Sequence, residues 1–117
     1  MVIELLKCEV DPDLREQYLQ VDAEVWTKAL AKCPGFLGKE VWLNPEEASE
    51  VIFVIRWATK EDWKSIPEEL LHQVEQKFAQ QMGSTYRIVE SAEYQVHQKG
   101  LKSEAEESIF YPNAKTS

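Results

Sequence analysis

The chain has 117 residues, of which 21 are acidic and 13 basic, so its net charge is -8 at pH 7 and its pI is near 4.8. With 44% hydrophobic residues and four each of Trp, Tyr and Phe, it has enough apolar side chains for one folded domain, which excludes a disordered chain, a collagen-like repeat and a disulfide-stapled miniprotein. Its acidity repels phosphate backbones and anionic lipids, so we expect neither nucleic acid nor a membrane surface as a partner.

The sequence begins with a predicted strand and a long helix. Apolar side chains alternate along residues 2–10, a pattern that is typical of a strand. Asp11 suits a helix N-cap, and Pro12 suits the first helical turn, where its missing N–H costs nothing. Apolar positions then recur every three or four residues to about Lys32. The dipeptide at 34–35, Pro-Gly, is expected to end this helix.

The middle of the sequence predicts a hairpin. Residues 36–43 and 50–58 are the most strand-like segments of the chain, and the loop 44–49 between them is short enough to join two antiparallel strands.

The remaining elements complete a recognisable order. Capping-box patterns that begin at Thr59 and at Ser65 predict a short turn of helix and then a longer helix that ends at Gly83. Residues 86–96 supply a fourth strand. The order β-α-β-β-α-β predicts a ferredoxin-like α+β fold, with a four-stranded antiparallel sheet and two helices on one face.

Two helices cover only one face of such a sheet, and the other face is also partly apolar. A second copy of the same sheet would cover it, so we expect a homodimer that forms an α+β barrel. Strict alternation assigns these residues to opposite faces: Phe36 and Trp42 against Leu37, Val41 and Leu43; Val51, Phe53, Ile55 and Trp57 against Ile52 and Val54; Ile88 and Tyr94 against Val89.

The chain divides into a domain at 1–97 and a C-terminal tail at 98–117. The tail contains the apolar stretch 108–112, which suggests an arm that docks on the partner subunit or on a sheet edge. The alternative is a disordered end.

The compartment is predicted from the N-terminus and the cysteines. Glu4 and Lys7 interrupt the first ten residues, so no signal peptide is expected, and the apolar run 51–55 is far too short to span a membrane. Cys8 and Cys33 form no CxxC motif or metal cluster. We therefore expect a cytoplasmic protein with two reduced thiols.

Two motifs carry a family resemblance over about residues 1–97. The sequence CPGFLG at 33–38 ends the first helix, and VIRWAT at 54–59 leads into an acidic helix start. This pattern resembles the dimeric α+β-barrel superfamily, and within it the antibiotic biosynthesis monooxygenase-like domains. The stretch WATKEDWKSIP at 57–67 is similar to a small uncharacterised family of cyanobacterial proteins.

The resemblance implies a range of activities, because the superfamily includes cofactor-independent oxygenases, haem-degrading enzymes, isomerases and proteins without demonstrated catalysis. The function we expect is therefore that of a monooxygenase-like protein that binds or oxidises a small aromatic molecule without a cofactor. The alternative is a non-catalytic module for small-molecule binding or assembly.

Aromatic side chains supply the candidate site. A cofactor-free oxygenase needs a dry aromatic cleft and a few polar groups that stabilise the substrate anion. The alternative role for large aromatic rings in a small domain is the core and the dimer interface. The candidates for a ligand pocket are Trp26, Trp57, Trp63, Tyr86, and the polar groups Tyr18 and Arg56.

Metal and haem chemistry have weaker support. Glu68, His72 and Glu75 share one helical face, but an acidic face with one His is usually just solvated, so no metal site is expected. Haem degradation in the superfamily relies on an Asn on the first strand, followed by a Trp and a His. Trp63 and His72 occur in that order, but residues 2–10 contain no Asn, which argues against haem.

Overall fold

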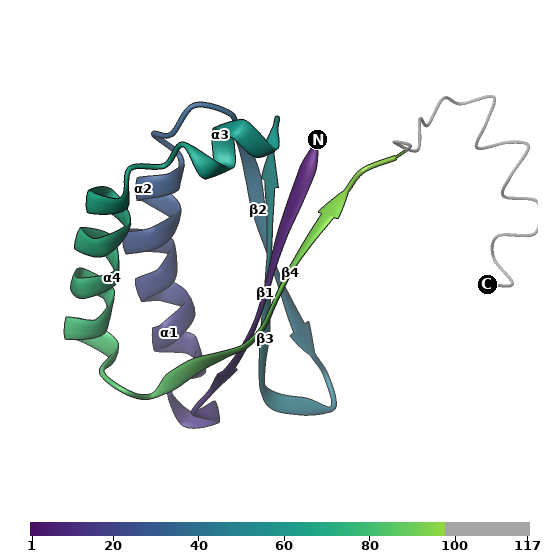
Figure 1. Cartoon of the computed structure of the whole chain (residues 1–117). Helices are drawn as coiled ribbons and strands as arrows, with labels where there is room; N and C mark the ends of the chain where they lie inside the picture. The colour runs from purple at the N-terminus through teal and green to yellow at the C-terminus, as the bar shows by residue number, and fades with distance from the viewer. Residues whose placement is uncertain (98–117) are drawn as a thin grey trace, which may run out of the picture.

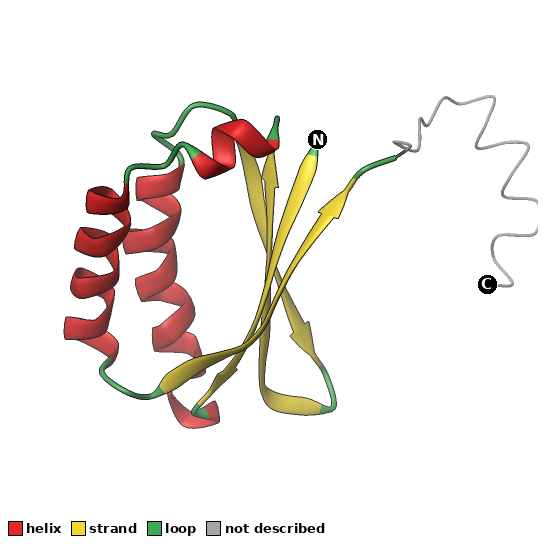
Figure 2. Ribbon diagram, viewed as in Figure 1, coloured by secondary structure: helices red, strands yellow, loops and turns green. Residues whose placement is uncertain are grey.

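The computed structural model describes residues 1–97 as a single sheet with all of its helices packed on one side (Figure 1). The predicted tail, residues 98–117, lies outside the described residues, so the proposed docking arm stays a prediction. Figure 2 shows the two layers, with the sheet in yellow and the helices in red. The four strands are β1 (Val2–Val10), β2 (Phe36–Asn44), β3 (Glu47–Trp57) and β4 (Tyr86–Gln95).

The sheet has the order β2-β3-β1-β4, and every neighbouring pair of strands is antiparallel. A 3-10 turn (Pro12–Leu14) leads into α1 (Arg15–Asp22), a π-helical segment (Ala23–Thr27) and α2 (Lys28–Leu30), which continue one another. The remaining helices are α3 (Lys60–Lys64) and α4 (Glu68–Met82). The predicted ferredoxin-like α+β fold is thus confirmed, with the expected short helix α3 added to the two long helical segments.

Two of the three predicted helix caps are confirmed. The Asp11 carboxylate accepts a hydrogen bond from the backbone N–H of Asp13, and the Thr59 hydroxyl accepts one from that of Asp62, each at 3.0 Å. The prediction for Ser65 is wrong. Its hydroxyl donates to the backbone carbonyl of Asp62 at 2.9 Å, and Pro67, with extended backbone, occupies the N-cap position of α4.

The core lies between the sheet and the helices. Val51, Phe53, Ile55 and Trp57 face the helices from the central strand β3, as strict alternation predicted. Trp57 is completely buried, and the ring of Phe36 packs edge-on against it at a centroid distance of 5.7 Å.

Two β-bulges overturn part of the predicted face assignment. The register of β2 shifts between Phe36 and Gly38, so Phe36 pairs with Trp57 and faces the helices rather than sharing the face of Trp42. A second shift in β4 leaves Val89 outside the pairing, so Ile88 pairs with Cys8 on the helix side. An extra residue in a strand moves the side chains beyond it to the other face, and strict alternation cannot foresee that.

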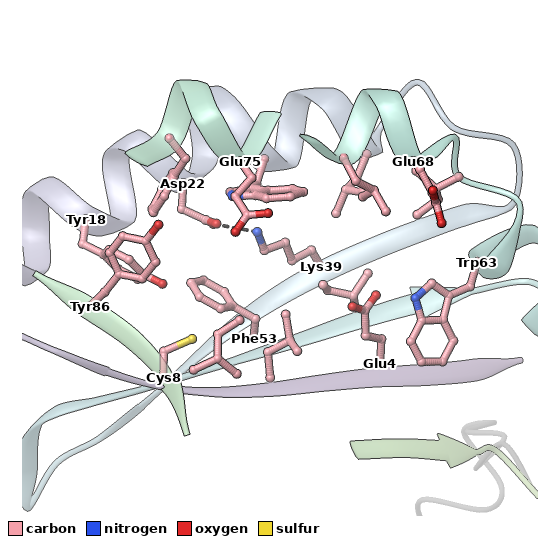
Figure 3. Close-up of a pocket in the computed structure, with 18 of the residues that line it drawn as sticks. Glu4, Cys8, Tyr18, Asp22, Lys39, Phe53, Trp63, Glu68, Glu75 and Tyr86 are labelled. Atoms are coloured by element: carbon pink, nitrogen blue, oxygen red, sulfur yellow. Dashed lines mark hydrogen bonds and ion pairs between the residues drawn. The ribbon is translucent and has the colours of Figure 1, made fainter. Parts of the chain in front are cut away.

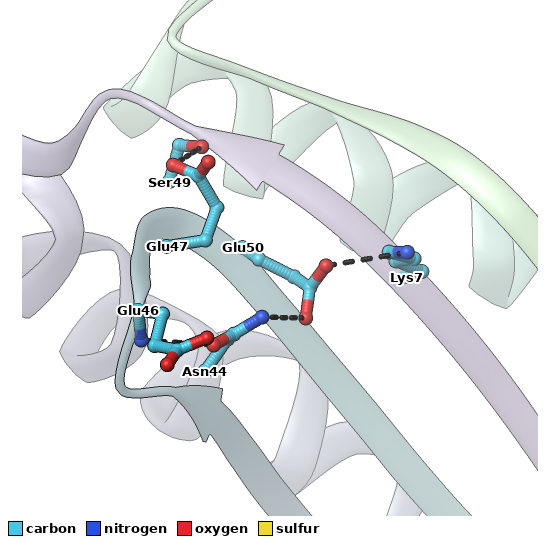
Figure 4. A network of polar contacts seen from close by, with 6 residues as sticks. All are labelled: Lys7, Asn44, Glu46, Glu47, Ser49 and Glu50. Carbon is cyan, nitrogen blue, oxygen red and sulfur yellow. Dashed lines mark hydrogen bonds and ion pairs between the residues drawn. The ribbon is translucent and has the colours of Figure 1, made fainter.

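A polar network fixes the end of the hairpin between β2 and β3 (Figure 4). The Asn44 side-chain amide donates to the Glu50 carboxylate at 3.2 Å, and Lys7 on β1 forms an ion pair with the same carboxylate, also at 3.2 Å. Asn44 Oδ1 accepts a hydrogen bond from the backbone N–H of Glu46 at 2.9 Å, which tightens the turn. Three strands are therefore tied together at this end of the sheet.

None of the helices within residues 1–97 is long and apolar enough to cross a membrane.

Candidate functional site

A cavity of about 430 Å³ lies between the sheet and the helices (Figure 3). Its side chains come from every strand and from all the main helical segments. In Figure 3, Tyr18, Tyr86 and Cys8 gather at one end, and Trp63 with Glu4 and Glu68 at the other. The lining residues are Glu4, Leu6, Cys8, Tyr18, Asp22, Trp26, Leu30, Lys39, Phe53, Ile55, Trp63, Lys64, Ile66, Glu68, Leu71, Glu75, Phe78, Tyr86 and Ile88.

A buried ion pair crosses the cavity wall. Lys39 on β2 pairs with Ile55 in the sheet register, so its side chain points to the helix side, where Nζ lies 2.6 Å from Asp22 Oδ2. Both side chains are almost fully buried, with exposed fractions of 4% and 7%. The Lys39 ammonium also sits over the ring of Phe53, 4.5 Å from its centroid. Burial raises the pKa of Asp22, while Lys39 acts in the opposite direction.

The helix that carries Asp22 is locally irregular. Asp22 is the last residue of α1, and the π-helical segment that follows carries Trp26, which also lines the cavity. Single π-turns within α-helices are frequent at functional sites, because the wider turn redirects the side chains around it.

Packed aromatic rings form one end of the cavity. Tyr18 and Phe78 meet edge-on at a centroid distance of 5.3 Å, and Tyr86 lies 5.4 Å from Tyr18 and 5.0 Å from Phe78. Burial and then the neighbouring Cys8 and Asp22 raise the pKa of Tyr18, and burial followed by the negative charge of Glu75 raises the pKa of Tyr86. Burial likewise raises the pKa of the Cys8 thiol. All three groups are therefore held in their neutral forms.

A carboxyl group and an indole define the other end. Glu4 Oε1 accepts a hydrogen bond of 3.1 Å from Nε1 of the buried Trp57. Burial raises the pKa of Glu4 above its ordinary value of 4.5, although the bond from Trp57 and the ammonium groups of Lys64 and Lys39 oppose this. The Lys64 ammonium lies over the ring of Trp63, 4.1 Å from its centroid.

Four of the six predicted pocket residues line this cavity: Tyr18, Trp26, Trp63 and Tyr86. The structure does not bring the other two to it. Trp57 lies behind Glu4 in the core, and Arg56 points to the opposite face of the sheet, where it pairs with Glu40 at 3.2 Å. Whether any of the six binds a ligand stays a prediction.

Several polar residues of the cavity were not predicted from the sequence, among them Glu4, Asp22 and Lys39. A signal for them was present. Asp22 lies midway between Tyr18 and Trp26 at four-residue spacing, and an acidic side chain in an apolar helical stripe needs a buried partner. Glu4 likewise alternates with Val2 and Leu6 on the helix side of its strand.

The cavity can bind a planar, mostly apolar molecule, because aromatic and aliphatic side chains make up most of its wall and a few polar groups can orient the ligand. Within residues 1–97, no three His, Cys, Asp or Glu side chains come together in a way that could hold a metal ion. Glu68 and Glu75 line the cavity, whereas His72 does not.

The fold and the cavity define a ferredoxin-like α+β domain with a pocket between its sheet and its helices. The family model for antibiotic biosynthesis monooxygenase matches residues 1–66, more than half of the chain, and the chain therefore belongs to this family. A search of curated proteins finds no match.

Solved structures show the same fold at low sequence identity. SnoaB, a cofactor-independent oxygenase from Streptomyces nogalater, has a TM-score of 0.64 at 15% identity, covering 84% of this chain and 94% of that one. The ActVA-Orf6 monooxygenase of Streptomyces coelicolor, solved with the ligand Nanaomycin D, has a TM-score of 0.64 at 11% identity, covering 87% and 92%. A conserved protein from Methanosarcina mazei has a TM-score of 0.59 at 13% identity, covering 80% and 90%.

The buried ion pair leads to a prediction about stability. Lys39→Met leaves the buried Asp22 carboxylate without its counter-charge, so we expect the free energy of unfolding to fall by about 3–5 kcal/mol. Adding Asp22→Asn removes the unpaired charge and should restore most of this loss. Urea denaturation of the two variants measures the difference. A double variant that is no more stable than Lys39→Met would contradict the role of the pair.

Glu4 leads to a prediction about pH. A carboxyl group whose pKa is raised by folding contributes stability below its unfolded pKa, and this contribution is lost as the pH rises through the folded pKa. In Glu4→Gln the side chain cannot ionise, so this loss of stability at higher pH disappears, and the amide oxygen can still accept the hydrogen bond from Trp57. We therefore expect the variant to be more stable than the wild type near neutral pH, and the two to converge below about pH 4. Urea midpoints across this range test it, with the exposed Glu69→Gln as the control.

Proposed function

We propose that this protein binds a small aromatic molecule in the cavity between sheet and helices and oxidises it with molecular oxygen, without a cofactor. The observation that carries the proposal is the cavity itself, in which Trp26, Trp63, Tyr18 and Tyr86 are joined by aliphatic side chains and make up most of the wall. Membership of the antibiotic biosynthesis monooxygenase family supports the same reaction class. The complex of the ActVA-Orf6 monooxygenase with Nanaomycin D supports a small organic molecule as the ligand.

The reaction balances with the substrate as its only reductant. One oxygen atom of O₂ enters the product as a carbonyl, the other leaves as water, and the substrate gives up two hydrogens. The protein would contribute by orienting the ring and by excluding water. The rival function is a binding or assembly module, in which the same cavity holds a ligand that does not react.

We also propose that the working unit is a homodimer that joins through the face of the sheet opposite the helices. Among the described residues, the large apolar side chains that remain most exposed lie on the two edge strands, β2 and β4, and some of them, such as Ile88, are on the helix side. Trp42 and Tyr94 are about half exposed and point away from the helices, in register with Ile52 and Ile3 on the central strands. A second copy of this face would cover them.

The cellular setting is part of the same proposal. Cys8 and Cys33 are both free thiols, which suits the reducing cytoplasm. The similarity of residues 57–67 to cyanobacterial proteins stays a prediction.

The oxygenase proposal is tested by oxygen uptake. With a panel of quinols and flavonoid-like aromatics, chelator-treated protein should consume oxygen and give a product that contains one atom from labelled O₂. Trp63→Ala removes a wall of the cavity and should lower the rate, by up to about a hundredfold if it misplaces the substrate. Gln80→Ala on the exposed side of α4 is the matched control. If a ligand binds and no oxygen is consumed, the protein is better explained as a binding module than as an oxygenase.

The dimer is tested by sedimentation equilibrium. The wild type should have a mass of about two chains. A stable interface on this face would typically bury about 800 Å² on each partner. Trp42→Glu combined with Tyr94→Glu places charges in that interface and should give a folded monomer, as judged by circular dichroism. Gln17→Glu on the outer side of α1 should leave the dimer intact. A wild-type mass of one chain at all concentrations would overturn the proposal.

A further inference from the structure

The charges around the cavity are unequal, and this bears on the ligand. Four carboxyl groups line it, those of Glu4, Asp22, Glu68 and Glu75, against the two ammonium groups of Lys39 and Lys64. The Asp22 and Lys39 charges neutralise each other at 2.6 Å. Among the described residues, three carboxyl groups therefore face a ligand with only Lys64 to balance them.

These charges are distributed through the site. Glu4 is half-buried on the sheet side, whereas Lys64, Glu68 and Glu75 are exposed and mark the side on which the cavity meets solvent. In Figure 3 the carboxyl groups of Glu68 and Glu75 project from α4 toward the sheet, and that of Glu4 projects from β1 toward α4.

The phenol of Tyr86 reports in part on the charge in this space. Burial is the largest cause of its raised pKa, and the negative charge of Glu75 is the next. Burial and then Asp22 also raise the pKa of the Cys8 thiol, although Tyr18 acts in the opposite direction. A carboxylate on a bound ligand would likewise be disfavoured by the negative charge of Glu75.

We propose that the cavity selects an aromatic ligand by charge, binding a ring with a positively charged amino group in preference to a neutral one and disfavouring a ring with a carboxylate. The ring lies against the aromatic walls, where Trp26 can also attract a cation, whereas the Lys64 ammonium already lies over the ring of Trp63. The amino group lies near Glu4, Glu68 and Glu75. This inference rests on the proposed function, since it concerns the ligand of the same cavity.

The test compares three probes that share a naphthyl ring: naphthylmethylamine, naphthylmethanol and naphthoate. Isothermal titration calorimetry near neutral pH should rank them in that order of affinity, with the amine at least about tenfold tighter than naphthoate. The difference should narrow at high salt, because Glu68 and Glu75 are exposed.

Variants identify the source of the preference. We expect each of three single substitutions to reduce the ratio of amine to naphthoate affinity by several-fold, while the affinity for naphthylmethanol changes little. They are Glu4→Gln, Glu68→Gln and Glu75→Gln. Glu69→Gln, one position along α4 and outside the cavity, should leave the difference unchanged. Thermal unfolding of each variant checks that the fold is retained.

The outcomes separate the two proposals. If all three probes bind equally, or if naphthoate binds as tightly as the amine, the charge preference is wrong and aromatic binding stands. A difference that none of the three cavity variants narrows also overturns the inference. If no naphthyl probe binds the wild type, both the inference and the proposed function fail.

Discussion

The ion pair between Asp22 and Lys39 is the interaction on which the interior of this domain depends. It joins α1 to the edge strand β2 through the layer of apolar side chains between the helices and the sheet. Two charges with exposed fractions of only 7% and 4% are costly to bury, and they are tolerated because each neutralises the other. The Lys39 ammonium also lies over the ring of Phe53, and all three residues line the cavity.

The sequence predicted the fold well because most elements have a clean period. Apolar alternation in the strands and three- and four-residue spacing in the helices are local signals, and so are the caps at Asp11 and Thr59. The bulges at Leu37 and Val89 are set by strand pairing, which a single strand does not reveal. The same limit explains the site. Trp57 and Arg56 follow each other in sequence, but pleating sends one into the core and the other to the far face.

The two faces of the sheet have separate tasks in the proposed function. The helix side carries the cavity, and its neutral phenols and raised carboxyl pKa values reflect a dry environment. The opposite side carries Trp42, Tyr94 and the Arg56–Glu40 ion pair, which would face the second subunit of the proposed dimer. Because the strands are shared, a substitution in β1 or β3 that shifts the strand would disturb both faces, whereas one in α4 would affect the cavity alone.

The placement of the four tryptophans gives the molecule a built-in set of optical reporters. Trp57 has no contact with solvent, so its emission should be blue-shifted and protected from iodide. Trp42 is 48% exposed on the open face, so iodide should quench it in a monomer and lose access to it in a dimer. Trp26 and Trp63 border the cavity and should respond to a ligand. Intrinsic fluorescence can thus distinguish ligand binding from subunit association in a single unlabelled sample.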